Sequence, residues 1–175
     1  MRNIGLHIRL FDPKIKRNFG AYAFQCSLAA AAVFLVLVLE GAHLSRVVII
    51  AAIGSTAFVL FVTPHSVAAS PRHVVGGHLI CLTIGGAFAA FDGTGFGIRL
   101  LEATPLVFDF EAAMAVGLGI FFMAATDTEH APAAGTALGM VAHDFSWALV
   151  LFVVGGVVGL SMLHMLLRPR LRNLL

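Results

Sequence analysis

The sequence predicts an all-α membrane protein, a compact bundle of five main transmembrane helices plus a short half-helix or re-entrant segment. Of its 175 residues, 59% are hydrophobic and only 11% are charged, and the mean hydropathy is +0.97. A soluble domain carries about 25% charged residues, so this chain cannot cover a soluble globule with polar surface. Eight of the eleven basic residues lie within the first 17 or the last 8 positions, and eight of the nine acids lie between them. Because Lys and Arg near spans stay on the cytoplasmic side, we expect both termini there, in a multi-pass protein of the cell's inner (plasma) membrane.

Five apolar stretches approach the roughly 20 residues that a helix needs to cross a bilayer. They comprise residues 20–39, 47–62, 71–91, 111–125 and 146–167. The three central stretches are shorter or richer in glycine than the first and the last, which is typical of discontinuous transporter helices. The charges around these stretches divide the chain into a basic cytoplasmic segment, a transmembrane domain and a basic tail, at residues 1–19, 20–167 and 168–175.

The number of crossings is set by the two basic ends. If both ends are cytoplasmic, the count must be even, and the five long stretches are one too few. Residues 132–142 are apolar but would span only about 16 Å as a helix. We therefore expect this segment to be a thinned crossing or a re-entrant half-helix near the functional centre, and residues 92–110 to form an outer loop.

Two polar breaks follow corresponding apolar stretches, at residues 63–78 and 126–139. Pro71 and Pro132 each suit the first turn of a helix that starts within one of these breaks. A helix N-terminus carries about half a positive charge and free N–H groups. Two such ends, with Arg72 beside one of them, predict a site for a small negative ion. The alternative explanation is that these residues are ordinary signals for the start of a helix and bind no ligand.

Both breaks resemble sequence blocks of the HPP family of integral membrane proteins. The run SPRHVVGGHL resembles that family's Pro-Arg-Asn-x-x-Gly-Gly-His block, and HAPAAGTAL resembles its His-Pro-Pro-(Gly/Ala)-Gly-Ala-Thr-Ala-Leu block. The similarity extends loosely over residues 47–167. Two positions depart from the pattern, since His73 stands where the family usually has Asn and Ala131 replaces the middle proline. The resemblance implies a compact bundle of membrane helices, and it associates plant plastid members with nitrite transport.

The preferred function is a transporter or channel for a small inorganic anion, with nitrite as the candidate that the resemblance implies. In this hypothesis Arg72 and the two helix starts attract the ion, His78 and His130 donate hydrogen bonds or protons, and Thr136 offers a hydroxyl. The predicted substrate-binding residues are Arg72, His73, Gly76, Gly77, His78, His130, Pro132, Gly135 and Thr136. The expected partners are the lipid bilayer, the anion and further copies of the chain in a homo-oligomer, with no nucleic acid. We expect no cofactor and no enzymatic activity, because no GxSxG, HExxH or comparable motif occurs.

Two other functions stay open at this point. The first is a metal-binding or metal-transporting protein, because imidazole and carboxylate are suitable ligands for divalent metals. Its candidate ligands gather around the two breaks and are His65, His73, His78, His130, His143, Asp127, Glu129 and Asp144. The second is a structural or regulatory membrane subunit with no pathway of its own.

Overall fold

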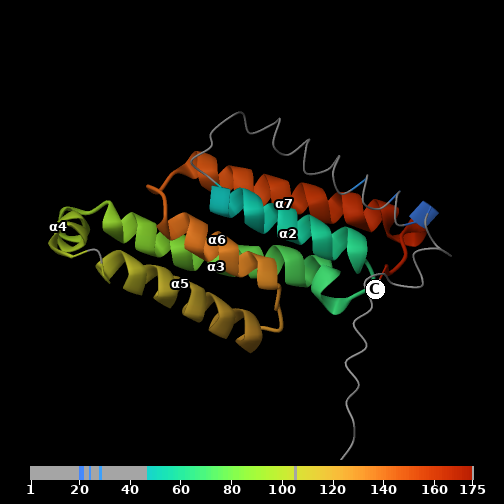
Figure 1. The fold of residues 1–175 in the computed structure, drawn as a ribbon, viewed down its shortest axis with the longest axis horizontal. Coiled ribbons are helices and arrows are strands. Elements are labelled where there is room, and N and C mark those ends of the chain that lie inside the picture. The colour runs from blue at the N-terminus through green and yellow to red at the C-terminus, as the bar shows by residue number, and fades with distance from the viewer. Residues whose placement is uncertain (1–19, 22–23, 25–27, 29–46, 105, 175) are drawn as a thin grey trace, which may run out of the picture.

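The computed structural model describes residues 20–21, 24, 28, 47–104 and 106–174, and these residues are helical without strands (Figure 1). The elements in order are α2 (Val47–Val62), the 3-10 turn η2 (Val67–Ala69), α3 (Pro71–Asp92), α4 (Gly95–Ala103), α5 (Leu106–Ala125), α6 (Ala131–Val141), α7 (Trp147–Leu167) and the 3-10 turn η3 (Arg168–Arg170). The predicted all-α class is confirmed. The predicted span 20–39 and the basic segment 1–19 lie largely outside the described residues.

The expectation that residues 92–110 form a loop is wrong, because this segment contains the helix α4 and the first residues of the helix α5. Thr94 caps α4, and its side chain accepts a hydrogen bond of 3.1 Å from the backbone N–H of Gly97. The helix α5 then begins at Leu106 rather than at residue 111, with Asp109 in its first turn. A carboxylate there is favourable because it lies near the positive end of the helix dipole.

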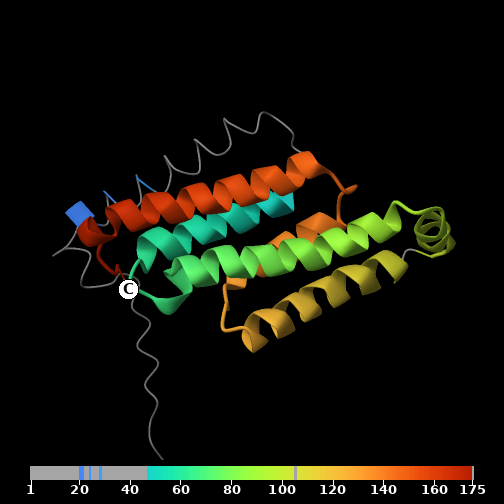
Figure 2. The same cartoon turned by 180° about the vertical axis from the view of Figure 1, so that it is seen from behind.

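The five main described helices run in two directions. In both views α3 and α6 run one way, while α2, α5 and α7 run the opposite way (Figures 1 and 2). The close contacts agree, since Gly77 of α3 lies beside His130 at the start of α6 and Gly85 lies beside Ala137 further along it. The short helix α6 therefore returns the chain to the far end of the bundle, which lets α7 run back beside α2.

Only part of the predicted set of spans has full length. Within the described residues, α3, α5 and the helix Trp147–Arg170 are long and apolar enough to cross a membrane, whereas α2 and α6 are shorter apolar helices. The 16 residues of α2 rise about 24 Å and the 11 residues of α6 about 16 Å, against a hydrocarbon core of about 30 Å. Five full-length spans are therefore not confirmed, while the short helix expected at 132–142 is present.

Small residues let α6 lie close to its neighbours. A Cβ built on Gly85 of α3 would lie 2.5 Å from the carbonyl oxygen of Ala137, and one built on Gly135 of α6 would lie 3.1 Å from Cβ of Ala52 in α2. A Cβ on Gly139 would collide with Ile49. The glycines Gly135 and Gly139 thus pack α6 against α2 of the same chain. Among the described residues, no atom lies within 4 Å of where a Cβ would stand on Gly155 or Gly159 of α7.

The basic tail is held against the α2–α3 connection. The backbone N–H of Leu174 donates to the carbonyl of Val62 at 2.9 Å, and the Asn173 side chain accepts from the N–H of His65 at 3.1 Å. Leu171 and Leu174 are buried. On α7, the His164 ring donates from Nε2 to the Pro64 carbonyl at 3.0 Å. The end of α7 and the tail are therefore tied to the loop that leads from α2 into α3.

Candidate functional site

Four polar side chains meet in the core of the bundle. Thr56 belongs to α2, His78 to α3, and Thr136 to α6, while His130 immediately precedes α6. All four are buried, with relative exposures of 0%, 2%, 0% and 0% in the order Thr56, His78, His130 and Thr136. Buried polar groups are stable only when they are hydrogen-bonded, so these residues must satisfy one another. We call these four residues the histidine–threonine network.

The hydroxyl of Thr56 is the centre of this network. Its Oγ1 lies 2.8 Å from Nε2 of His78 and 3.1 Å from Nε2 of His130. The other ring nitrogen of His78, Nδ1, lies 2.7 Å from Oγ1 of Thr136. The other ring nitrogen of His130 lies 2.9 Å from the carbonyl oxygen of Ala68. The two rings are tilted by 53° with their centroids 5.3 Å apart, so they lie next to each other without stacking.

One arrangement of the protons follows from the Ala68 carbonyl, which can only accept a hydrogen bond. The Ala68 carbonyl has no proton, so His130 Nδ1 must carry one. If His130 is neutral, its Nε2 must accept, and the single hydroxyl proton of Thr56 is donated to it. His78 then donates from Nε2 to the Thr56 oxygen and accepts at Nδ1 from the Thr136 hydroxyl. Every donor in this chain of bonds points the same way, from Thr136 towards Ala68.

A second proton arrangement fits the same heavy atoms. The Thr56 hydroxyl also lies 3.0 Å from the carbonyl oxygen of Ala52, one turn earlier in α2. If the hydroxyl donates to Ala52, then His130 Nε2 can carry a proton and donate to the freed lone pair of the Thr56 oxygen. His130 is then a doubly protonated imidazolium. A rotation of one hydroxyl is therefore sufficient for the network to hold either charge state of His130.

Glycines bring the segment before α6 close enough to build this network. A Cβ on Gly77 would lie 2.9 Å from the carbonyl oxygen of Thr128 and 3.0 Å from Cβ of His130, and one on Gly76 would lie 2.9 Å from Cγ2 of Thr128. Both glycines were predicted to bind substrate. The structure gives them a packing role, because their missing side chains make room for residues 128–130 against α3.

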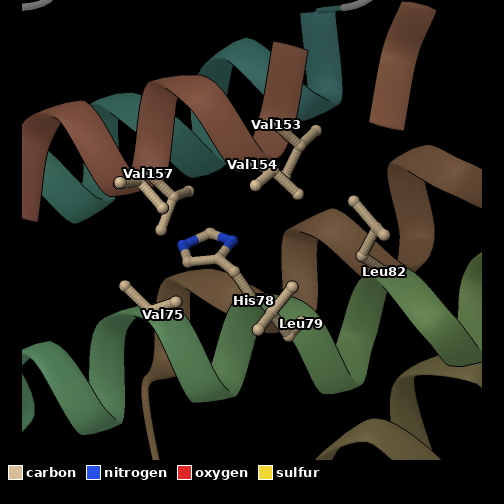
Figure 3. A pocket seen from close by; sticks show the side chains of 8 residues that line it. Val75, His78, Leu79, Leu82, Val153, Val154 and Val157 are labelled. Atoms are coloured by element: carbon tan, nitrogen blue, oxygen red, sulfur yellow. The ribbon is translucent and has the colours of Figure 1, made fainter. Parts of the chain in front are cut away.

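A small cavity adjoins one side of the network. It lies between α3 and α7 and has a volume of about 10 Å³, roughly the space needed for one water molecule. The His78 ring projects from α3 towards the valines of α7, with Val75 and Leu82 on either side (Figure 3). Apart from the imidazole, the lining is aliphatic: Val75, Leu79, Leu82, Val153, Val154, Val157 and Val158.

Arg72 does not join the buried network, contrary to the shared site expected from the sequence. Its side chain has a relative exposure of 64%, and its Nη2 donates to the Thr126 carbonyl at 2.9 Å and lies 3.3 Å from Oδ2 of Asp127. His130, in contrast, is fully buried. The reason is local, since Arg72 is in the first turn of α3, beside the polar connection between α5 and α6. This arginine therefore belongs to an exposed ion pair at the end of the bundle.

Removing that ion pair should change stability little. We expect Arg72→Gln to alter the free energy of unfolding by no more than about 1 kcal/mol, because exposed salt bridges contribute little after solvent screening. Thermal denaturation of the purified protein in detergent measures this. A large loss of stability would contradict the exposed position of Arg72.

The other predicted residues divide between the two ends of the bundle. His73 lies beside Asp127 and Glu129, close to Arg72. His143 and Asp144 follow α6, which carries them to the opposite end, so the single cluster expected around the second break is wrong. Pro132 stands at the start of α6 and borders a hollow between α2 and α6.

Thr56 is the member of the network that sequence reasoning missed. Its segment, residues 47–62, reads as an apolar span, and a single threonine in it gives no motif. A signal was nevertheless present, because Thr56 is one of only two hydroxyl residues in that stretch, next to Ser55. A hydroxyl inside a membrane helix needs either a backbone carbonyl or a partner on another helix.

The comparison with known proteins fits this architecture. No curated protein and no solved structure matches the chain. The family model described as "HPP, transmembrane region" matches residues 15–172, which is almost the whole chain. The resemblance noted in the two sequence blocks is therefore confirmed, and the chain belongs to the HPP family of integral membrane proteins.

Proposed function

We propose that this chain transports a small inorganic anion across the membrane together with a proton, and that the histidine–threonine network is where the two bind. Nitrite is the anion that the family resemblance favours. The single observation that carries the proposal is that the Thr56 hydroxyl has two possible hydrogen-bond acceptors. Its one hydroxyl proton can go to His130 or to Ala52, so His130 can gain and lose a proton while the atoms stay in place.

The argument for a proton begins with the cost of an anion at membrane depth. A charge there requires several kcal/mol unless a partner of opposite sign is close. Among the described residues, the buried polar groups are four histidines with threonines, a serine and Glu111, and none of them is Lys or Arg. The positive partner of a buried anion must then be an imidazolium.

A histidine suits this role because its imidazole can gain and lose a proton, and in the core the charged ring becomes favourable only when an anion beside it offsets the charge. An anion that binds beside protonated His130 makes a neutral pair with it. Release of the anion on the other side leaves the extra proton unfavourable in the core, so the proton leaves as well. The expected transport is therefore one proton with one monovalent anion and no net charge.

The described conformation corresponds to a closed state of such a transporter. The cavity beside His78 holds about one water and is smaller than nitrite with its hydration shell. Its walls are side chains of α3 and α7, so passage requires these helices to separate. His164 and the tail connect α7 to the α2–α3 loop. We therefore expect this loop to move together with α7 when α3 and α7 separate.

The test is nitrite uptake into proteoliposomes that contain the purified full chain. Uptake should accelerate when the outside is more acidic than the inside, and it should acidify the lumen with one proton per nitrite. A change of membrane potential at constant pH should leave the rate unchanged, because the transported pair is neutral. Protein-free liposomes measure the passive leak of nitrous acid, which must be subtracted.

Two results would contradict this function. Nitrite uptake that follows the membrane potential and ignores the pH gradient would mean that the anion crosses without a proton. An absence of protein-dependent flux for nitrite and for a panel of other small anions would favour a structural or regulatory subunit. Arg72→Gln serves as a control variant, because its exposed ion pair lies outside the network and its uptake should match the unmodified chain.

A further inference from the structure

We propose that His73, Asp127 and Glu129 bind Zn²⁺ or a similar first-row divalent cation at the end of the bundle where α3 begins. Each of the three side chains offers one ligand atom, and these atoms all lie within 4.8 Å of one another. They come from two elements, since His73 is in the first turn of α3 and the two acids are in the connection between α5 and α6. The site is separate from the histidine–threonine network and does not depend on the proposed transport.

The main observation is that the His73 ring is buried while its Nε2 nitrogen faces two carboxylates. Its side chain is only 7% exposed, and its Nε2 lies 3.8 Å from Oδ1 of Asp127 and 3.7 Å from Oε2 of Glu129. Hydrogen bonds between nitrogen and oxygen are about 2.7–3.2 Å long, so this buried nitrogen faces two carboxylates and is bonded to neither. Ligands that surround Zn²⁺ at about 2.0–2.2 Å lie roughly 3.3–3.6 Å apart. The two distances from Nε2 to the carboxylate oxygens are close to the spacing of ligands around a common ion.

A second observation concerns the other nitrogen of the same ring. His73 Nδ1 lies 2.8 Å from Oγ of Ser70. Ser70 is the N-cap residue of α3, yet its side chain makes no capping hydrogen bond to that helix. With a metal ion at Nε2, the Nδ1 nitrogen would carry the proton and donate it to the Ser70 hydroxyl, which leaves the Nε2 lone pair for the ion. Histidines that bind metals are commonly oriented by such a bond from the second ring nitrogen.

Charge and access favour a dication. Asp127 and Glu129 supply two negative charges, and Arg72 contacts Oδ2 of Asp127, so Oδ1 stays turned towards His73. The two carboxylate side chains are 70% and 58% exposed. An ion can therefore arrive from water, and rotation of these exposed groups closes the remaining distance. One nitrogen and two oxygen ligands with a water as the fourth suit Zn²⁺ better than Mg²⁺ or Ca²⁺, which prefer oxygen ligands alone.

Calorimetric titration of Zn²⁺ into the purified full chain, after removal of any affinity tag, tests this site. We expect one Zn²⁺ per chain and no comparable binding of Mg²⁺. Stoichiometric binding should disappear in His73→Gln, Asp127→Asn and Glu129→Gln. Ser70→Ala should bind about 10- to 100-fold more weakly, because the orienting bond to His73 is lost. Zn²⁺ should also raise the melting temperature of the unmodified chain and not that of Glu129→Gln.

The matched control is His65→Gln, which removes another histidine at the same end of the bundle. His65 contacts the tail through the Leu171 carbonyl and lies outside the three-residue cluster, so this variant should bind Zn²⁺ as the unmodified chain does. The exposed Glu129 keeps the test valid if His73→Gln fails to fold. A chain that binds no Zn²⁺, or a Glu129→Gln variant that binds it with unchanged affinity, would overturn the proposal.

Discussion

Thr56→Val is expected to reduce proton-coupled nitrite uptake by about 10- to 100-fold. Valine has nearly the shape of threonine but no hydroxyl, so His78 Nε2–H loses its acceptor and His130 Nε2 loses its partner in the core. An unsatisfied buried polar group costs roughly 1–3 kcal/mol, and each 1.4 kcal/mol corresponds to about a factor of ten in rate. The initial rate of uptake under a fixed pH gradient is the measurement.

Two matched variants separate the role of this hydroxyl from a general effect of losing a threonine. Thr83 is an exposed residue of α3 whose hydroxyl donates to the Leu79 carbonyl at 2.8 Å, the same bond that Thr56 makes to Ala52. Thr83→Val should therefore transport normally. Thr56→Ser keeps the hydroxyl and should retain most of the activity. Uptake in Thr56→Val at the rate of the unmodified chain, still coupled to protons, would exclude the histidine–threonine network as the site.

Gly85→Ala is expected to give the largest loss of stability of any single methyl group added to the described part of α3. The new Cβ would lie 2.5 Å from the Ala137 carbonyl oxygen and 2.8 Å from Cβ of Met140. Both obstacles are backbone or the base of a side chain, so neither can rotate away. The helices α3 and α6 must separate, and overpacking of this kind costs about 1–3 kcal/mol. Thermal or denaturant unfolding in detergent measures the loss.

The control for this change is Gly159→Ala on α7. In the described part of the chain no atom lies within 4 Å of where its Cβ would stand, and alanine is the better helix former. We expect its free energy of unfolding to change by no more than about 0.5 kcal/mol. Equal destabilisation by both substitutions would show that helix flexibility, rather than the close approach of α6 to α3, accounts for the effect.

The helices could be predicted from the sequence where apolar runs end at clear signals. The stretch 47–62 coincides with α2, and Pro71 and Ser146 mark the starts of α3 and α7 within one residue. Residues 132–142 were expected to form either a thinned crossing or a re-entrant half-helix, and the short helix α6 is found there. The piece that failed, residues 92–110, contains glycines, a proline and several charges. Those features are typical of a loop, but the Thr94 cap and the acid at the start of α5 favour helix there.

The site was predicted only in part, because sequence spacing does not say which residues lie inside. His78, His130 and Thr136 were singled out and do meet, but the helix starts were expected to attract the ion with Arg72. The pairing of Arg72 with Asp127 could not be read from a separation of 55 positions. Likewise, His73 and His78 are five positions apart in one helix and serve different clusters at different depths.

The structure shows the surroundings of the two residues, His73 and Ala131, that depart from the HPP sequence blocks. His73, which stands at the Asn position of the HPP block that this segment resembles, supplies the buried ring nitrogen that faces Asp127 and Glu129. Ala131 replaces a proline at the exposed first residue of α6, next to Pro132, which still fixes the first turn. His73 is therefore the departure that bears on the proposed metal site.

The shortness of α6 has a consequence for how the protein is made. Eleven residues are too few to be held in lipid by their own hydrophobicity, so this segment depends on the slot that α2, α3 and α5 provide. Those three helices are all synthesised before it. We therefore expect assembly in the membrane to be ordered, with α2, α3 and α5 packing together before α6 enters between them. A substitution that narrows the space between these helices, such as Gly85→Ala, would impair insertion of α6 during biogenesis as well as destabilise the folded protein. The expected result is that α7 inserts in the wrong orientation.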